Sequence, residues 1–275
     1  MSAPAPARPD GDRTRAVPET QAAAAVEATI ESSAGWRSWR GLLIQPALIA
    51  VVLAGYFVWL ATADLTETEA RPLSWDSLGP AIAEHLRLTF LAAAIVVVLA
   101  VPLGILLTRR PLRRLSGPVI AVANVGQAAP AIGLFVLLAM WLGFGPWTAV
   151  VALVAYAVLP VLRNTMVGLS GVDAKLVEAG RGMGMSALAV LLRVELPLAV
   201  PVILAGVRTA LVLLVGTATL AVFIDGGGLG ILITTGINLY LPDLLVSGAL
   251  LVALLALLID WLGRVVEHVA HPRGL

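Results

Sequence analysis

Long uncharged stretches are the feature of this 275-residue chain that most restricts its fold. Residues 42–61, 88–108 and 115–162 contain no Asp, Glu, Lys or Arg. About 20 apolar residues of helix cross a hydrocarbon core about 30 Å thick, so the first two stretches each suit one membrane span and the third suits two. Only 13% of the residues are charged, about half the share usual in soluble domains. The chain is therefore predicted to be an all-α integral membrane protein.

The apolar pattern predicts six transmembrane helices. Their expected ranges are 42–61, 88–108, 118–142, 147–162, 198–224 and 244–262. The turn signal at residues 143–146, Gly-Phe-Gly-Pro, divides the longest stretch. Asn124, Gln127 and Pro130 interrupt the third span, and irregular backbone at membrane depth is tolerated only where protein buries it or water lines it. These three residues are candidates for the translocation path, with a helix–helix hydrogen bond as the alternative.

The positions of Lys and Arg orient the spans. With the N-terminus in the cytoplasm, fifteen of the eighteen basic residues lie on the cytoplasmic side, two lie outside and Arg208 lies in a span. Both termini are then cytoplasmic, in a multi-pass protein of the plasma or inner membrane. The expected organisation is a disordered cytoplasmic tail (1–41), a first span with an outer loop (42–87), the main transmembrane domain (88–263) and a short cytoplasmic tail (264–275). A surface helix is expected near residues 78–86.

A few polar residues within or beside the spans have more than one interpretation. Arg208 either clamps helices or lines the path, since basic residues at depth usually face the bundle interior, or its side chain snorkels to the cytoplasm. Asp260 and Arg264 are expected to form an i,i+4 ion pair. The three His residues lack partners at metal-ligand spacing and are expected at the membrane interface, so no metal site is predicted.

The largest polar connection between spans, residues 163–196, contains a compact helical unit. Asp173 is placed to cap a helix over 174–180, and Ser186 to cap a second helix over 187–195. Pro197 is expected to close the unit. The first helix ends at a glycine-rich hinge, formed by Gly180, Gly182 and Gly184. A side chain at position 184 would obstruct either a positive φ or a close approach. Residues 173–197 therefore form either a site that a partner grips or an amphipathic connector on the bilayer surface.

This unit resembles the EAA loop of the inner-membrane subunits of ATP-binding-cassette (ABC) importers. That loop reads Glu-Ala-Ala, three residues, Gly, nine residues and Ile-x-Leu-Pro; here Glu178-Ala179-Gly180, Gly184 and Val194-Glu195-Leu196-Pro197 have the same spacing. The resemblance implies a type I (MetI-like) importer permease whose loop 173–197 couples to an ATPase. The residues implied in coupling are Glu178, Ala179, Gly180, Gly182, Gly184, Leu196 and Pro197.

Further runs resemble the osmoprotectant permeases, which import glycine betaine, choline, carnitine and related quaternary amines. They include residues 159–165, 196–208 and 226–230, with Asp225 standing where the family more often has Gly. The candidates for the outer mouth of the pathway are Asp225, Gly226, Gly227 and Gly228. Asp225 either contacts a docking protein or attracts a cationic solute.

The chain lacks the parts that would let it work alone. It has no G-x-x-x-x-G-K-[ST] phosphate-binding loop, and its longest outer loop, residues 64–87, is too short for a solute-binding domain. The resemblance thus implies a non-enzymatic permease with no cofactor of its own, the ATP and Mg²⁺ being held by a partner ATPase. Expected partners are this ATPase, an extracytoplasmic binding protein, a second permease copy or paralogue and membrane lipid, but no nucleic acid. The alternatives are import of another small solute, such as an amino acid, and a secondary transporter, which would need charged coupling residues in several spans.

Overall fold

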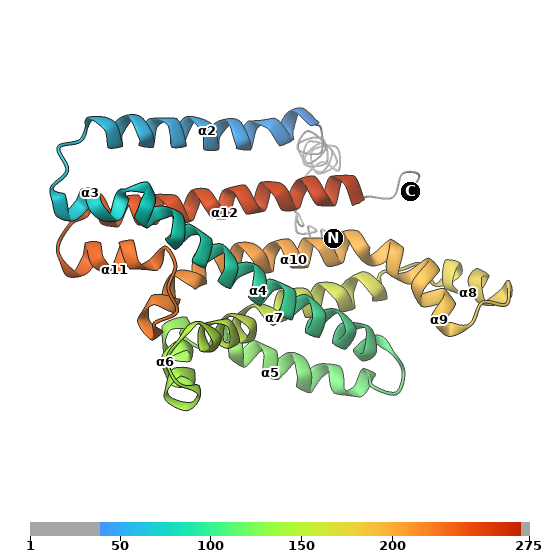
Figure 1. Ribbon diagram of the computed structural model, residues 1–275. Coiled ribbons are helices and arrows are strands. Elements are labelled where there is room, and N and C mark those ends of the chain that lie inside the picture. The colour runs from blue at the N-terminus through green and yellow to red at the C-terminus, as the bar shows by residue number, and fades with distance from the viewer. Residues whose placement is uncertain (1–38, 271–275) are drawn as a thin grey trace, which may run out of the picture. The chain divides into compact units, whose positions relative to one another are not determined.

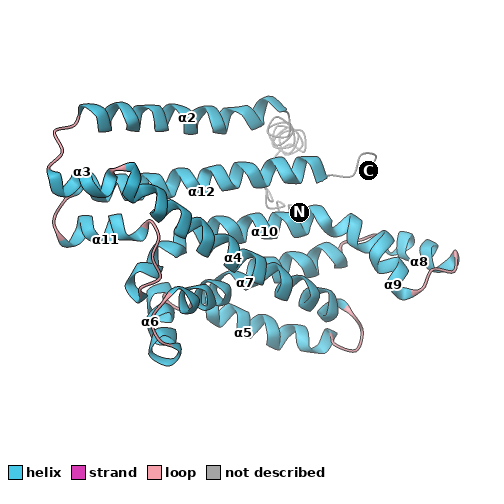
Figure 2. Ribbon diagram, viewed as in Figure 1, coloured by secondary structure: helices cyan, strands magenta, loops and turns pink. Residues whose placement is uncertain are grey.

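The computed structural model describes residues 39–270, and within that range the chain forms helices and no strand (Figures 1 and 2). The elements are α2 (Trp39–Thr62), α3 (Glu67–Leu73), α4 (Trp75–Thr108), η1 (Arg113–Leu115), α5 (Ser116–Ala128), α6 (Ala131–Leu142), α7 (Pro146–Ser170), α8 (Ala174–Gly182), α9 (Ala187–Val190), η2 (Leu191–Glu195), α10 (Leu196–Ala218), η3 (Thr219–Ile224), α11 (Gly230–Asn238) and α12 (Pro242–Ala270). The chain divides into two units, Met1–Leu43 and Ile44–Leu275, and every helix from α3 onward lies in the second. The all-α prediction is confirmed. Most of the predicted tail over 1–41, and the last five residues of the chain, lie outside the described residues.

Five helical segments are long and apolar enough to cross a membrane, and a bent pair of helices counts as a sixth if the two form a single span. The bent pair is α5 and α6, whose axes differ by 100°. Ala129 adopts an extended conformation (φ −63°, ψ 143°) between them, as the residue before a proline prefers. The predicted interruption at Pro130 is therefore a sharp bend.

Several helices continue past the ends of the predicted spans. The expected outer loop over 64–87 is helical from Trp75 and runs without a break into the second span as α4. Likewise, α7 extends to Ser170 and α12 to Ala270. A change from apolar to polar side chains marks where a helix meets water, whereas the helix itself ends only where the backbone turns. Charge patterning therefore underestimated the helix lengths.

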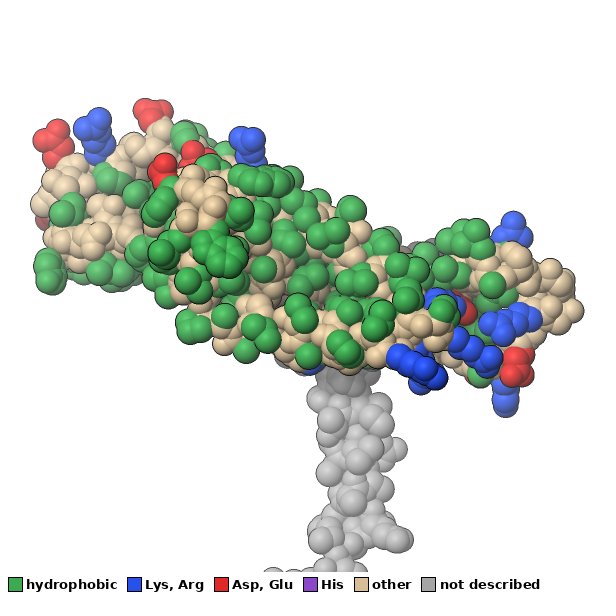
Figure 3. All heavy atoms as spheres, turned by 90° about the horizontal axis from the view of Figure 1, so that it is seen from below, with side chains coloured by type: hydrophobic (Ala, Val, Ile, Leu, Met, Phe, Trp, Pro, Cys, Tyr) green, Lys and Arg blue, Asp and Glu red, His purple; other side chains and the backbone are tan. Residues whose placement is uncertain are grey.

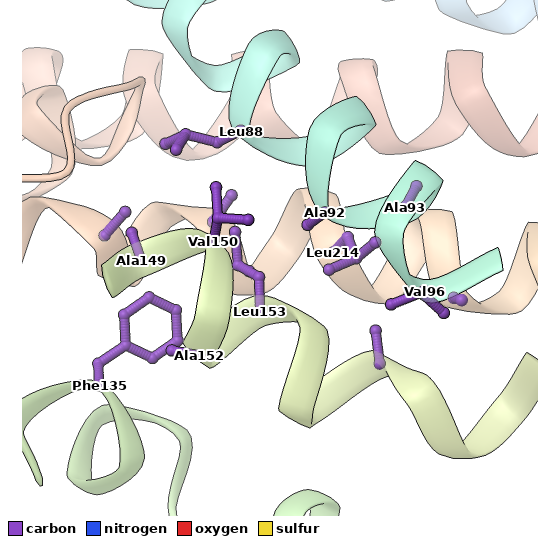
Figure 4. Packing of buried hydrophobic residues seen from close by; sticks show 14 of the residues in the cluster. Leu88, Ala92, Ala93, Val96, Phe135, Ala149, Val150, Ala152, Leu153 and Leu214 are labelled. Atoms are coloured by element: carbon purple, nitrogen blue, oxygen red, sulfur yellow. The ribbon is translucent and has the colours of Figure 1, made fainter. Parts of the chain in front are cut away.

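The core of the second unit lies where α4, α7 and α10 pack together, with α6 against one end of α7. Figure 4 shows Leu88, Ala92 and Val96 of α4 facing Val150 and Leu153 of α7 and Leu214 of α10. Small residues allow these backbones to approach closely. A Cβ at Gly206 of α10 would lie 2.5 Å from the Cβ of Asn164 of α7, so only glycine fits at this crossing.

Charged side chains gather at the ends of the helices, and hydrophobic side chains cover the middle (Figure 3). Most of the Lys and Arg side chains visible in this view lie over the end that carries α8 and α9. The glycine-rich turn between η3 and α11 lies toward the opposite end (Figure 1). This separation agrees with the charge asymmetry from which the sequence orients the spans.

Candidate functional site

The segment over residues 173–197, called here the hinge segment, begins with the caps that its sequence predicts. The Asp173 carboxylate accepts a hydrogen bond from the Lys175 amide at 2.9 Å, at the start of α8. The Ser186 hydroxyl oxygen accepts one from the Ala189 amide at 3.3 Å, at the start of α9. Each cap satisfies a backbone donor that the first turn of a helix leaves unpaired. Both predicted caps are confirmed.

The two helices are separated by a glycine turn. Gly184 has φ +82°, and a Cβ there would meet nothing within 4 Å. Left-handed backbone, rather than close packing, is therefore the reason for glycine at this position. Gly180 is buried and faces the side chains of Val190 and Val194, so α8 folds back onto the helix that follows.

Pro197 does not close the unit, and this part of the prediction is wrong. The chain continues from α9 through a π-helical turn at Leu191–Glu195 directly into α10. In a regular α-helix the Pro197 ring would clash with the carbonyl four residues earlier, whereas the first turn of a helix tolerates proline. The wider π turn lies directly before Pro197, and it joins the hinge segment to α10 as one helical unit.

An ion pair that is buried at its Glu195 end fixes this π turn to α4, and the sequence did not reveal it. The Arg109 guanidinium donates two hydrogen bonds to the Glu195 carboxylate, one of them at 3.2 Å. The Glu195 side chain is 9% exposed and that of Arg109 is 33% exposed. Arg109 belongs to the basic turn after α4, 86 residues earlier in the chain. The only hint in the sequence is an acidic residue among the apolar positions 194–196.

The hinge segment carries several exposed side chains. Its exposed apolar residues are Leu176, Met183, Leu188 and Leu192. Glu178 and Ala179 are also exposed, and Gly182 has open space around it. Glu178 lines a cavity of about 650 Å³. Arg109, Arg113, Arg181 and Glu195 also line this cavity. Apolar side chains that lie exposed among charged ones are typical of a surface that binds a partner protein.

The predicted outer-mouth residues form a turn held by α4. Asp225, Gly227 and Gly228 all have positive φ, at 60°, 78° and 88°. The Gly228 amide donates to the Glu84 carboxylate at 3.1 Å. Gly226 is buried beside Ala221 and Ala149. The glycines are thus required by the shape of this turn.

His85 lies beneath the same turn and is fully buried, although the sequence places it at the interface. Its Nδ1 accepts a hydrogen bond from the Leu229 amide at 3.3 Å. The proton therefore resides on Nε2, which donates to the Val215 carbonyl at 3.0 Å. His85 connects α4, α10 and the glycine turn.

The four predicted pathway residues fall into two separate places. Asn124 of α5 accepts a hydrogen bond from Arg163 of α7 at 3.0 Å, the helix–helix contact that the sequence offered as the alternative. Gln127 is one helical turn further along α5, and Pro130 starts α6. Arg208 of α10 instead forms ion pairs with Asp260 and Glu267 of α12.

The Arg208 contacts belong to a larger polar cluster. Its distances to Asp260 and Glu267 are 3.5 and 3.0 Å. Asp260 also pairs with Arg264 at 2.8 Å, which confirms the predicted i,i+4 pair. Gln45 of α2 donates to the Leu257 carbonyl at 2.9 Å and contacts Arg264. These contacts favour a helix clamp as the role of Arg208.

The fold is that of an ABC importer membrane subunit. Solved structures of the methionine ABC transporter MetNI in inward-facing conformations superpose on it with a TM-score of 0.65, at 26% identity, over 76% of this chain and all of that one. Residues 100–269 match the family described as the binding-protein-dependent transport system inner membrane component, and the chain belongs to this family.

Three curated relatives are similar over most of their length. OpuCB of Bacillus subtilis (strain 168), a glycine betaine/carnitine/choline transport system permease protein, is 44% identical over 70% of this chain and 88% of its own. OpuBB of the same organism, a choline transport system permease protein, has the same identity and coverage. OsmW of Salmonella typhimurium, an osmoprotectant import permease protein, is 39% identical over 70% of this chain and 91% of its own.

Proposed function

We propose that this chain is the membrane subunit of an ATP-driven importer of osmoprotectant quaternary amines such as glycine betaine, choline or carnitine. The observation that carries the proposal is the 44% identity, over 88% of its length, to a permease named for these three solutes. The chain forms the pathway for the solute and transmits the movement of the ATPase, and it carries out no reaction itself.

The hinge segment is the proposed ATPase binding site. Its exposed leucines and Met183, together with the exposed Glu178 and Arg181, offer a partner both apolar and charged side chains to contact. The π turn and the pair between Arg109 and Glu195 connect this surface to α10 and α4. A displacement of the hinge segment by the ATPase would therefore move two core helices directly.

The remaining partners follow from the same proposal. ATP and Mg²⁺ bind the ATPase, and a separate binding protein delivers the solute on the side of Asp225 and Gly226. A second permease copy or paralogue completes the pathway. The chain lies in the inner membrane with both termini in the cytoplasm, an orientation that rests on the excess of Lys and Arg on the hinge-segment side.

Uptake into proteoliposomes tests the solute assignment. The full chain is reconstituted with its ATPase and binding protein, and radiolabelled glycine betaine, choline, carnitine and methionine are compared with and without internal ATP. We expect ATP-dependent uptake of at least one quaternary amine and none of methionine. Uptake of methionine alone would favour the amino-acid alternative, and uptake driven by an ion gradient without ATP would favour a secondary transporter.

A further inference from the structure

A cavity of about 440 Å³ opens beside the glycine turn. Its walls are the first half of α4, the start of α7 and the turn at residues 225–227. The residues that matter here are Glu84, Arg87, Trp147 and Asp225. The volume falls within the roughly 300–1,000 Å³ typical of small-molecule sites.

The α4 wall changes from polar to apolar along one helical face. Glu84, Arg87, Leu88 and Leu91 line the cavity, and their spacing of three or four residues places them on the same side of α4. Val150 of α7 adds to the apolar part. The cavity therefore combines a charged rim with a hydrophobic floor, the usual composition of a site for a small amphipathic ligand.

Two hydrogen bonds donated by backbone amides hold the three walls together. The Gly228 amide donates to Glu84 Oε2, and a Cβ at Gly227 would collide with that same oxygen. On the other side, the Gly145 amide donates to the Ile224 carbonyl at 2.7 Å. Pro146, in the first turn of α7, then fixes the start of the helix that carries Trp147. The positions of the segments that form the cavity are thus fixed by the fold.

The charges and the indole match a zwitterion with a quaternary ammonium head. Two carboxylates, Glu84 and Asp225, lie on the rim with the Arg87 guanidinium. Trp147 is 65% exposed and presents an aromatic surface to the cavity. An indole face attracts quaternary ammonium groups more strongly than the ring of Tyr or Phe does, and Arg is suited to a carboxylate.

We propose that this cavity is a transient binding site of the permease itself for the solute. Trp147 and Asp225 contact the ammonium head, Arg87 contacts the carboxylate of betaines and carnitine, and Glu84 holds the turn that completes the site. This assignment rests on the proposed function for its solute class. Choline, which lacks a carboxylate, uses the same site without Arg87.

Equilibrium binding in the absence of the binding protein tests this site. The full chain with its ATPase is placed in lipid nanodiscs, and binding of radiolabelled glycine betaine and choline is measured. We expect saturable binding of both, and Trp147→Leu should weaken both by about tenfold, within the range of a cation–π contact. The matched control is Trp141→Leu in α6, since Trp141 is 88% exposed and lies outside the cavity; it should bind as the wild type does.

Two charge variants test the contacts to the two ends of the ligand separately. Arg87→Gln should weaken glycine betaine binding by about fivefold and leave choline unchanged, since only the betaine has a carboxylate. Asp225→Asn keeps a residue type that tolerates positive φ and should weaken choline by about threefold, less so at high salt.

The results distinguish failure of this binding site from failure of the proposed function. Absence of saturable binding, or equal binding by Trp147→Leu and the wild type, overturns the site even when the complete transporter takes up quaternary amines. Equal losses of choline and glycine betaine in Arg87→Gln overturn the assignment of Arg87 to the carboxylate. Failure of the complete wild-type transporter to take up any quaternary amine contradicts the proposed function itself.

Discussion

Replacing Arg109 with Gln is expected to destabilise the protein more than replacing its partner, Glu195, with Gln. The side chain of Glu195 is 9% exposed, so Arg109→Gln leaves a nearly buried carboxylate without its cation. The side chain of Arg109 is 33% exposed, so Glu195→Gln leaves a guanidinium that water still reaches. The amide oxygen of Gln at position 195 can also accept one of the two hydrogen bonds.

The exposed fractions of the two side chains determine how much free energy of unfolding each substitution removes. An exposed ion pair contributes at most about 1 kcal/mol, whereas removing one partner of a fully buried pair costs about 3–5 kcal/mol. This pair is buried at one end only. Arg109→Gln should therefore lower the free energy of unfolding by about 2–3 kcal/mol and Glu195→Gln by about 1 kcal/mol.

A double-mutant cycle measures the pair directly. Unfolding of the wild type, both single variants and the double variant is followed by SDS titration in mixed micelles. The coupling energy should be about 1–2 kcal/mol, and the double variant should be more stable than Arg109→Gln alone. A larger loss for Glu195→Gln than for Arg109→Gln, or a coupling energy below about 0.5 kcal/mol, would show that burial of Glu195 does not determine the strength of this pair.

Three further substitutions test local features of the structure. Asp173→Ala should destabilise α8 by about 1 kcal/mol through loss of its cap, seen as faster amide hydrogen exchange in that helix, while Asp173→Asn should not. Gly206→Ala should lower the free energy of unfolding by about 1–3 kcal/mol, because its Cβ would meet Asn164; Gly216→Ala in the same helix has open space and should show no loss. His85→Ala leaves two buried backbone groups without partners and should cost about 2–5 kcal/mol by the same measurement, so an unchanged stability would contradict its bridging role.

Features encoded by neighbouring residues could be predicted from the sequence. The end of the second span, the caps at Asp173 and Ser186, and the hinge at Gly184 each depend on a few adjacent residues, and the structure has them where the pattern indicates. The resemblance to importer permeases predicted the whole fold. It could be recognised from the sequence because the spacing from Glu178 to Pro197 that carries it lies in one segment.

Features that depend on distant residues could not be predicted. The pairing of Arg109 with Glu195 joins positions 86 residues apart, and hydropathy gives no information on such a contact. The burial of His85 depends on two backbone groups that the fold brings to it. The cavity beside the glycine turn likewise combines three segments, so its residues first appear together in the folded chain.

The proposed role of the hinge segment is to bind the ATPase and move with it, and co-purification of the two proteins measures this binding. Tagged wild type and Gly184→Trp are co-expressed with the ATPase and compared for membrane insertion, recovery of the ATPase and ATP-dependent uptake. Gly184 has φ +82° and an open surrounding, so Trp strains the turn and projects into the proposed interface. The control is Gly55→Trp in α2, where the surrounding is also open. We expect Gly184→Trp to insert normally and to lose both ATPase recovery and uptake. Wild-type recovery and uptake by this variant would show that the hinge segment is not the ATPase binding site.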